Sequence, residues 1–400
     1  MEKNNKTLNV PHLRFPEFSG EWEKTSIGEC FSKVENGLTY DTDNTSGVPV
    51  TRIETISDKS INYDRVGYAN IDDKISKYEM QYGDVLFSHI NSLKHIGKTA
   101  FYDAAQPLYH GMNLLLLRAK KSLDSKFLYY TLNTHKFLHR CQVLANQAVN
   151  QASINTKELK SINISVPQMR EQQKISGLIS LLDERIETQK KIIEKYESLI
   201  RGLITSVNKG KICKCKTVSL KDVLTEVHEK NVQNHEVCSV SVTQGVINQI
   251  DYLGRSFAAK EILHYNVVNY GDIVYTKSPT GEFPYGIVKR SNLDKAVAVS
   301  PLYGVYRPIN DYVGVYLHLY FKSPVNTKNY LHSLIQKGAK NTINITNQHF
   351  LDNKIQIPEQ DILETFVSAA SEIEREIQAE NRVLSCMEKQ KNYLLSKMFI

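Results

Sequence analysis

The sequence contains an internal repeat, which constrains the fold strongly because two copies of one unit are expected to fold alike. Residues 82–88 read YGDVLFS, and residues 270–276 read YGDIVYT, 188 positions further along. The segment 162–167 (INISVP) returns at 353–358 (NKIQIP), so that the two prolines lie 191 positions apart. Two shorter landmarks recur in the same order: Ser26-Ile27 as Ser219-Leu220, and 153–156 as 344–347. The chain is therefore predicted to be two copies of one unit, each nearly half of its 400 residues.

Each unit begins with a segment of mixed character, residues 22–167 and 208–358. Both segments are rich in Tyr, Val, Ile and Thr and are interrupted by Gly, Asn and Asp, which is typical of short strands joined by turns. The repeated Tyr-Gly-Asp at 82–84 and 270–272 predicts a turn that enters a buried strand, with Gly and Asp serving the turn. We expect two similar mixed α/β domains with short strands.

Each unit ends in a long helix. After Pro167 and again after Pro358, apolar residues recur alternately three and four positions apart, which predicts helices over 168–206 and 359–398. Each would be about 58 Å long at 1.5 Å per residue. Five heptads indicate a coiled-coil seam, with an ordinary core helix as the alternative. The predicted seam residues are Ile175, Ile179, Leu182, Ile186, Ile193, Tyr196, Phe366, Ile373, Ile377, Leu384 and Leu394, with polar Gln189 and Glu380 at matching positions.

The short connections decide how the two helices pair. The second domain follows the first helix after about ten residues and runs directly into the second helix at Pro358. A parallel pair would force that domain to span nearly the whole helix length of about 58 Å, so antiparallel pairing is expected. The predicted fold class is α+β: two similar mixed α/β domains joined by two long antiparallel coiled-coil helices, a pseudo-two-fold internal repeat. The predicted parts are an N-terminal tail (1–21), domain one (22–167), a central helix (168–207), domain two (208–358) and a C-terminal helix (359–400).

Charge is shared unequally between the domains. Residues 207–358 hold 18 basic and 11 acidic side chains, whereas residues 1–167 hold 20 and 18. A mild basic excess fits a polyanionic partner without requiring one, and we expect the second domain to hold phosphate more tightly. Side chains that donate to phosphates and base edges follow or flank the strands, although polar loops without a ligand fit them equally well. The candidate DNA contacts are Arg52, Ser88, His89, Asn91, Lys94 and Lys98 in unit one, and Lys277, Ser278, Lys289 and Arg290 in unit two.

No catalytic or cofactor motif is present in the sequence. Gly-x-Gly-x-x-Gly, Asn/Asp-Pro-Pro-Tyr, His-Glu-x-x-His, Gly-x-Ser-x-Gly and Cys-x-x-Cys are all absent. Residues 95–99 (HIGKT) resemble the end of a phosphate loop, but Ser92 stands where the first glycine is required. The six cysteines form no framework, no apolar run approaches 18 residues, and the start has no apolar leader. We expect a non-catalytic, cytoplasmic protein with free thiols that itself binds no cofactor or metal.

Several segments together resemble one family, the specificity subunits of type I restriction–modification enzymes. Residues 13–18 (LRFPEF) with Trp22 look like the start of such subunits. The Tyr-Gly-Asp strands, the Ile-x-Ile/Val-Pro boundary before 171–175 (EQQKI) and the helix after each domain are similar too. The likeness covers essentially all 400 residues. The second unit departs from it at 361–364 (DILE), where the family usually has a Glu-Gln pair.

The resemblance implies a bacterial protein with two target-recognition domains, each reading one half of a bipartite, asymmetric site on double-stranded DNA. The half-sites would lie about a helical turn apart, ~34 Å. It also implies that the helices act as a ruler and dock two modification (methyltransferase) subunits, joined by restriction subunits. S-adenosylmethionine, ATP and Mg would be bound by those partners, and a membrane would not be involved. The alternative from another class is a two-headed scaffold that binds only proteins.

Overall fold

The chain folds into two compact units. The computed structural model describes residues 8–41, 43–57, 59–71, 75–148, 151–208, 214–255, 261–337 and 343–400. Unit 1 comprises Met1–Gln189 together with Val383–Ile400, and unit 2 comprises Lys190–Arg382. Each unit contains one mixed α/β domain, head one (residues 22–167) or head two (residues 214–358), and parts of both long helices.

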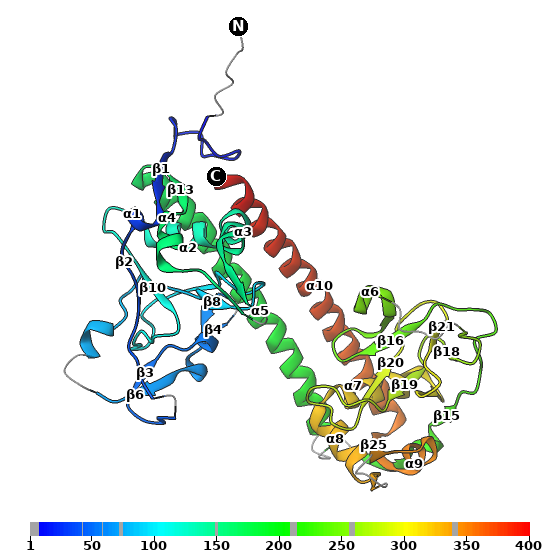
Figure 1. Ribbon diagram of the computed structural model, residues 1–400. Coiled ribbons are helices and arrows are strands. Elements are labelled where there is room, and N and C mark those ends of the chain that lie inside the picture. The colour runs from blue at the N-terminus through cyan, green and yellow to red at the C-terminus, as the bar shows by residue number, and fades with distance from the viewer. Residues whose placement is uncertain are drawn as a thin grey trace. The chain divides into compact units, whose positions relative to one another are not determined.

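The two predicted long helices are present as α5 (Met169–Asn208) and α10 (Gln360–Met398) (Figure 1). Unit 1 holds the first half of α5 and the last part of α10, whereas a parallel pair would bring the two N-terminal halves together. Within unit 1, Lys391 of α10 forms an ion pair with Asp183 of α5. The predicted antiparallel pairing is therefore confirmed.

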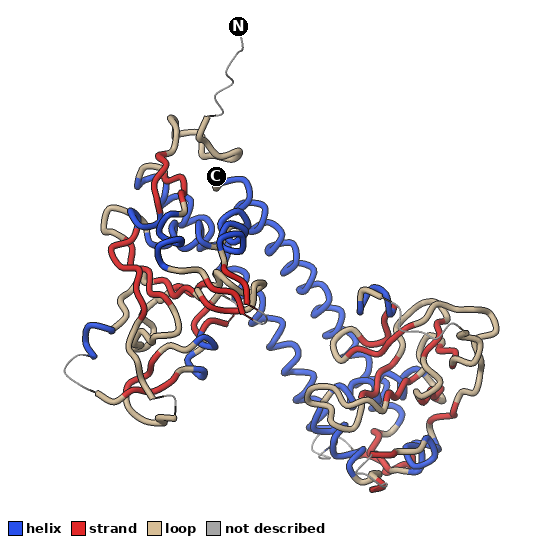
Figure 2. The backbone as a smooth tube through the Cα atoms, in the orientation of Figure 1, coloured by secondary structure: helices blue, strands red, loops and turns tan. Residues whose placement is uncertain are grey.

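Head one is built on a four-stranded antiparallel sheet in the order β2-β10-β7-β9. Smaller pairs are β1-β13, β3-β6 and β4-β5, and β11-β12-β8 forms a three-stranded sheet. Figure 2 shows most helices of this head near α5, while strands, loops and short helical turns make up the rest. The strands are β1 (Glu23–Ser26), β2 (Phe31–Asn36), β3 (Val48–Val50), β4 (Ile56–Ser57), β5 (Ser60–Ile61), β6 (Gly67–Ala69), β7 (Val85–Phe87), β8 (Ile90–Asn91), β9 (Thr99–Phe101), β10 (Leu115–Ala119), β11 (Asn146–Ala148), β12 (Gln151–Ser153) and β13 (Asn163–Val166). The helices are α1 (Ile27–Cys30), α2 (Ser125–Leu132), α3 (His135–Leu144) and α4 (Thr156–Ser161).

Head two repeats this topology. Its four-stranded sheet has the order β15-β22-β19-β20, and β14-β25 and β23-β24 correspond to β1-β13 and β11-β12. The strands are β14 (Cys215–Ser219), β15 (Leu224–Glu226), β16 (Cys238–Ser241), β17 (Gly245–Asn248), β18 (Asn266–Val268), β19 (Ile273–Thr276), β20 (Ile287–Arg290), β21 (Val297–Val299), β22 (Gly304–Pro308), β23 (Gln336–Lys337), β24 (Ile343–Asn344) and β25 (Lys354–Pro358). The helices are α6 (Gln249–Leu253), α7 (Asp311–Lys322), α8 (Pro324–His332) and α9 (Asn347–Asp352). The same strand order in both heads confirms the internal repeat.

The repeated Tyr-Gly-Asp forms the turn before β7 and β19, as predicted. Gly83 and Gly271 have φ angles of 91° and 87°, a region that side chains with a Cβ rarely adopt. The aspartate closes the turn, because Asp84 accepts a hydrogen bond from the backbone N of Gln81 at 2.7 Å. Asp272 does the same for the backbone N of Asn269 at 2.9 Å. The motif is therefore structural in both heads.

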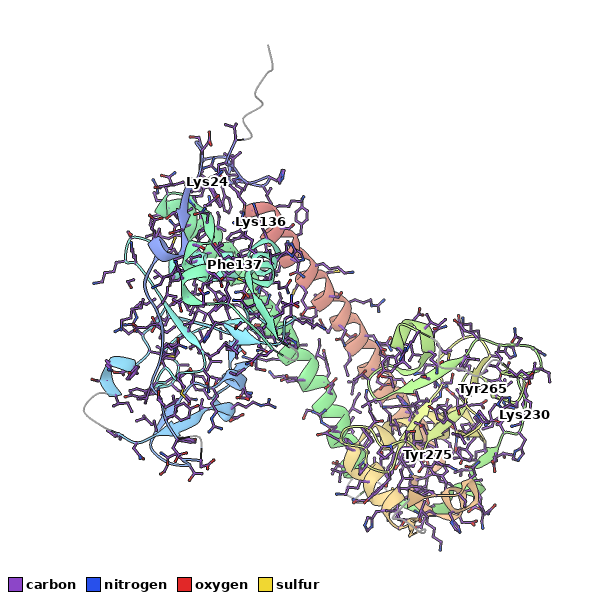
Figure 3. All side chains as sticks on the ribbon, viewed as in Figure 1. Lys24, Lys136, Phe137, Lys230, Tyr265 and Tyr275 are labelled. Atoms are coloured by element: carbon purple, nitrogen blue, oxygen red, sulfur yellow. The ribbon has the colours of Figure 1, made fainter. Side chains whose placement is uncertain are left out.

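The two cores differ in composition. In unit 1, Trp22 packs on Phe127 with ring centroids 5.9 Å apart, and Phe127 stacks on Phe399 at 5.3 Å, which joins the end of the chain to head one. In unit 2, Phe350 lies 4.9 Å from both Tyr275 and Tyr306. Figure 3 labels Tyr275 inside head two, where it is fully buried. Each cluster buries large apolar surface, the first between head one and the C-terminal segment and the second inside head two.

The N-terminal segment is fastened to unit 1 by a buried ion pair. The Arg14 guanidinium binds both carboxylate oxygens of Glu171 on α5 at 2.7 and 2.8 Å, and Glu171 is fully buried. Trp22 Nε1 donates to the same carboxylate at 3.2 Å. The backbone N of Leu13 donates to the carbonyl of Lys397 near the end of α10 at 2.9 Å. We call the contact of Arg14, Trp22 and Glu171 the clasp; it ties the segment 13–22 to both long helices.

Candidate functional site

The first group of predicted contacts lies directly after β7. Ser88 and His89 are buried, and Asn91 is half-buried. Asn91 Nδ2 donates to Ser88 Oγ at 3.1 Å, so this amide is held in place from inside the head. Burial lowers the pKa of His89, which keeps the ring neutral, and its Nδ1 has no hydrogen-bond partner among the described residues. The structure therefore brings Ser88, His89 and Asn91 together.

The loop that follows β8 carries the exposed cations Lys94 and Lys98. Its turn is fixed by the backbone bonds from Gly97 N to Ser88 O at 2.9 Å and from Ser88 N to Lys98 O at 2.8 Å. Arg52 belongs to another part of the head, where its guanidinium lies 6.0 Å from the centre of the Tyr40 ring. Lys94 and Lys98 are thus free to reach a polyanion from a rigid loop, whereas Arg52 is half-buried.

In unit 2, Lys277 and Ser278 occupy the place after β19 that His89 occupies after β7. Lys277 is half-buried, and burial lowers its pKa, while Ser278 is exposed. The equivalent positions therefore hold a neutral ring in head one and an amine in head two.

Lys289 and Arg290 lie on β20, and both are buried, with 3% and 4% of their surface exposed. Arg290 is paired with Asp311 and Asn292, and its guanidinium stacks 4.5 Å above the Tyr270 ring. The structure thus separates these two residues from the exposed Ser278. Their assignment as DNA contacts remains a prediction.

Sequence reasoning missed two glutamines on the sheet that carries Asn91. Asn91 pairs with Ala152 of β12, and β12 pairs with β11, so that Gln147 and Gln151 lie on the same three-stranded sheet. Both glutamines are exposed. Amide side chains can bond adenine through two hydrogen bonds, and a β-ribbon fits the major groove. The signal in the sequence was the amide-rich run at 146–151 (NQAVNQ).

The predicted helix seam is buried to different degrees. Ile175, Ile179, Leu182, Ile186 and Ile193 on α5 are buried, as are Phe366 and Ile377 on α10. Tyr196, Ile373, Leu384 and Leu394 are half-buried. Gln189 is 7% exposed, so a polar side chain does occupy the inner face of α5.

An apolar groove runs along the long helices within unit 1. Leu178 and Leu181 of α5 are 37% and 61% exposed. They border a cavity of about 630 Å³ that Met387, Gln390 and Leu394 of α10 line from the other side. Apolar side chains gathered at an exposed groove are typical of a protein-docking surface.

Metal-binding and membrane-spanning features do not occur in the described part of the chain. Among the described residues, no group of three or more His, Cys, Asp or Glu side chains is arranged to hold a metal ion. Within the same residues, no helix combines the length and apolarity that crossing a bilayer requires.

Comparisons with known proteins point to one family. The family model described as "Type I restriction modification DNA specificity domain" matches residues 19–198. Two similar proteins from Methanocaldococcus jannaschii are assigned as specificity subunits of the type I restriction enzymes MjaX and MjaVIII, with 38% identity over 204 residues and 23% over 205. The matches cover 50% and 49% of this chain and 48% and 47% of those proteins. The chain thus spans about half the length of the relatives it matches.

A solved structure shares the fold of the whole chain. The S subunit of a type I restriction-modification system from M. genitalium aligns with 98% of this chain and 99% of its own, with a TM-score of 0.60 and 12% identity. At that identity the likeness concerns the fold alone. Together with the matched domain, it confirms the resemblance that the motifs predicted.

Proposed function

We propose that this chain, which carries a type I DNA specificity domain, is the DNA-recognition subunit of a type I restriction–modification enzyme. The observation that carries the proposal is the match of that domain to residues 19–198, on a chain whose topology is duplicated. Each head would read one half of a bipartite, asymmetric site. The half-sites would differ because equivalent positions, such as His89 and Lys277, carry different side chains.

Within head one, different side chains would read the bases and bind the phosphates. Asn91, Gln147 and Gln151 would contact base edges, since amides discriminate adenine. Lys94 and Lys98 are exposed cations on the neighbouring loop and would bind phosphates, which position the protein without reading sequence. In head two, Lys277 and Ser278 would take the corresponding place.

The long helices would dock two modification subunits. The groove beside Leu178 and Leu181 is supporting evidence, because it leaves apolar side chains of α5 exposed. Restriction subunits would join through the modification subunits. S-adenosylmethionine, ATP and Mg would be bound by these partners, and this chain would contribute no catalytic group. The same groove would also serve the alternative function, a scaffold that binds only proteins.

Binding to duplex DNA separates the two functions. With the modification subunit and S-adenosylmethionine present, the chain should retard a pool of random duplexes in a gel-shift assay. The double variant Lys94→Ala/Lys98→Ala should bind more weakly, and the slope of log K against log salt should fall by about 1.8, or ~0.9 for each phosphate that is no longer neutralised. Lys136→Ala, an exposed lysine on α3 labelled in Figure 3, is the matched control and should bind like the wild type. An assembled complex that leaves every duplex unbound would favour the scaffold.

A further inference from the structure

A cavity of about 310 Å³ lies within unit 2, away from the loop of Lys277 and Ser278. It is bounded by β20, α7, α10 and the turn between β16 and β17. The charged side chains that line it are Lys289, Arg290, Lys322 and Glu374, and the neutral polar ones include Gln244 and Gln378. Three cations and one carboxylate therefore face the same enclosed space.

Lys289 is the unusual member of this group. Only 3% of its surface is exposed, yet among the described residues its amine has no hydrogen bond or ion pair. Its amine instead lies near the Phe283 ring, 6.0 Å from Nζ to the centroid. Burial, together with the charge of Lys322, lowers the pKa of Lys289 to about 8. A buried cation is costly unless an anion compensates it, and the carboxylate that acts on Lys289, Glu374, is already paired with Lys322.

The neighbours of Lys289 do not neutralise it. Glu374 is the carboxylate that lines the cavity, and Lys322 Nζ already binds its Oε1 at 3.1 Å. Arg290 bonds Asp311 and Asn292, but its Nε is buried and has no hydrogen-bond partner in the described part of the chain. His318 accepts a bond from the backbone N of Arg290 at 3.3 Å, and burial lowers the pKa of His318 to about 3, so the ring is neutral. Within the described residues, Lys289 Nζ therefore lacks an acceptor of its own.

We propose that this cavity binds a small molecule through one phosphate-type oxyanion, held by Lys289. An oxyanion supplies the acceptor that Lys289 Nζ lacks, and charge-assisted bonds of this kind are strong. The amides of Gln244 and Gln378 can bond the remainder of the molecule. The volume lies at the small end of ligand sites, which suits a compact ligand of about nucleotide size or less.

A free small molecule fits this site better than a phosphate of duplex DNA. Lys289 is enclosed by elements from the head and by α10, and its amine is almost inaccessible from outside. A duplex presents its phosphates on a broad cylinder, which reaches exposed side chains rather than the floor of a cavity.

The test is calorimetric titration of the full chain with inorganic phosphate and, separately, with AMP, at constant ionic strength. We expect saturable binding that Lys289→Met weakens by at least about tenfold, because one charge-assisted bond is lost. Lys289→Arg should keep most of the affinity. Lys328→Met removes an exposed lysine of α8 and should leave binding unchanged. Lys289→Met should fold at least as stably as the wild type, since it removes a buried charge that lacks a partner.

Two further binding experiments identify the class of the ligand. With sulfate as the probe, binding should weaken as the pH rises above 8, because Lys289 then loses its proton. The other charged groups that line the cavity are Arg290, Lys322 and Glu374, and His318 is neutral in that range because its pKa is about 3. Adding duplex DNA should not displace phosphate. The proposal is overturned if the wild type binds neither probe, if Lys289→Met binds as tightly as the wild type, or if duplex DNA competes with phosphate. The last result would make Lys289 a DNA contact.

Discussion

The two heads share one ion pair and differ in the strand beside it. Arg118 binds both oxygens of Asp84 at 2.8 and 2.7 Å, and Arg307 binds those of Asp272 at 3.0 and 3.1 Å. The next strand differs between the heads. In head one, Val85 pairs with Phe101. In head two, Ile273, which is equivalent to Val85, pairs with Arg290.

In each head, the tyrosine of the repeated Tyr-Gly-Asp contacts this residue. Phe101 packs edge-on against Tyr82 at 5.7 Å, and Arg290 stacks over Tyr270 at 4.5 Å. The repeat therefore keeps the buried pair that shapes the turn and lets the neighbouring position change from apolar to charged. The two heads therefore share the pair that shapes the turn and differ in the residue that packs on the repeated tyrosine.

The clasp should give the largest difference between the units, because unit 2 has no equivalent of Glu171: the position 191 residues on is Ile362. Arg14→Ala leaves a buried carboxylate without its cation, so unit 1 should lose about 3–5 kcal/mol of unfolding free energy. Emission from Trp22, the single tryptophan, reports the unfolding of unit 1 in urea. The double variant Arg14→Ala/Glu171→Ile, which copies unit 2, should recover much of the loss. Equal losses in the single and double variants would contradict this.

The shared ion pair should give the next largest effect, and it should be unequal between the heads. Arg118 is 20% exposed and Arg307 is 50% exposed, while both aspartates are 1% exposed. Arg118→Ala should therefore cost about 3 kcal/mol, and Arg307→Ala about half of that, because water reaches Asp272 more easily once the arginine is gone. Hydrogen exchange measured separately on β7 and β19 gives the two losses. A larger loss in head two would reverse the ranking.

The seam should give a smaller and equal effect in both units. Ile186 and Ile377 occupy equivalent positions, 191 apart, and are 6% and 8% exposed. Ile→Ala at either position should cost about 2 kcal/mol, because each side chain fills a comparable space. Amide exchange along α5 and α10 measures both. Losses that differ by more than about 1 kcal/mol would show that the two seam positions are packed differently.

A further difference is a dependence on pH that only unit 2 should show at this position, since Ala100 pairs with Leu86 where Lys289 pairs with Val274. Unfolded lysine keeps its proton up to about pH 10.5, whereas buried Lys289 releases it near pH 8. Between these values the unfolded state binds more protons, so the unfolding free energy of unit 2 should rise with pH. The difference between the wild type and Lys289→Met isolates this contribution. A difference that does not change across the window would refute it.

The sequence was sufficient for features with a regular pattern. The 3.6-residue period predicted the ends of α5 and α10 to within two residues. The duplicated segments predicted that the two heads contain matching sheets. The clasp could not be predicted from the sequence, because Arg14 and Glu171 are 157 residues apart and no local pattern indicates that they pair. Lys289 and Arg290 were chosen by side-chain type and by an expected loop location, whereas they lie on strand β20. β20 is buried on both faces, so its composition showed no alternation that could have revealed their burial.

The central claim is that each head reads its own half of one DNA site. Mapping methylated adenines across the genome of a host that expresses the chain with its modification subunit tests this directly. The wild type should yield one bipartite, asymmetric motif with an unread gap. Asn91→Ala in head one should relax one half of that motif and leave the other half and the gap unchanged. A contiguous motif, or a change in both halves, would contradict the claim.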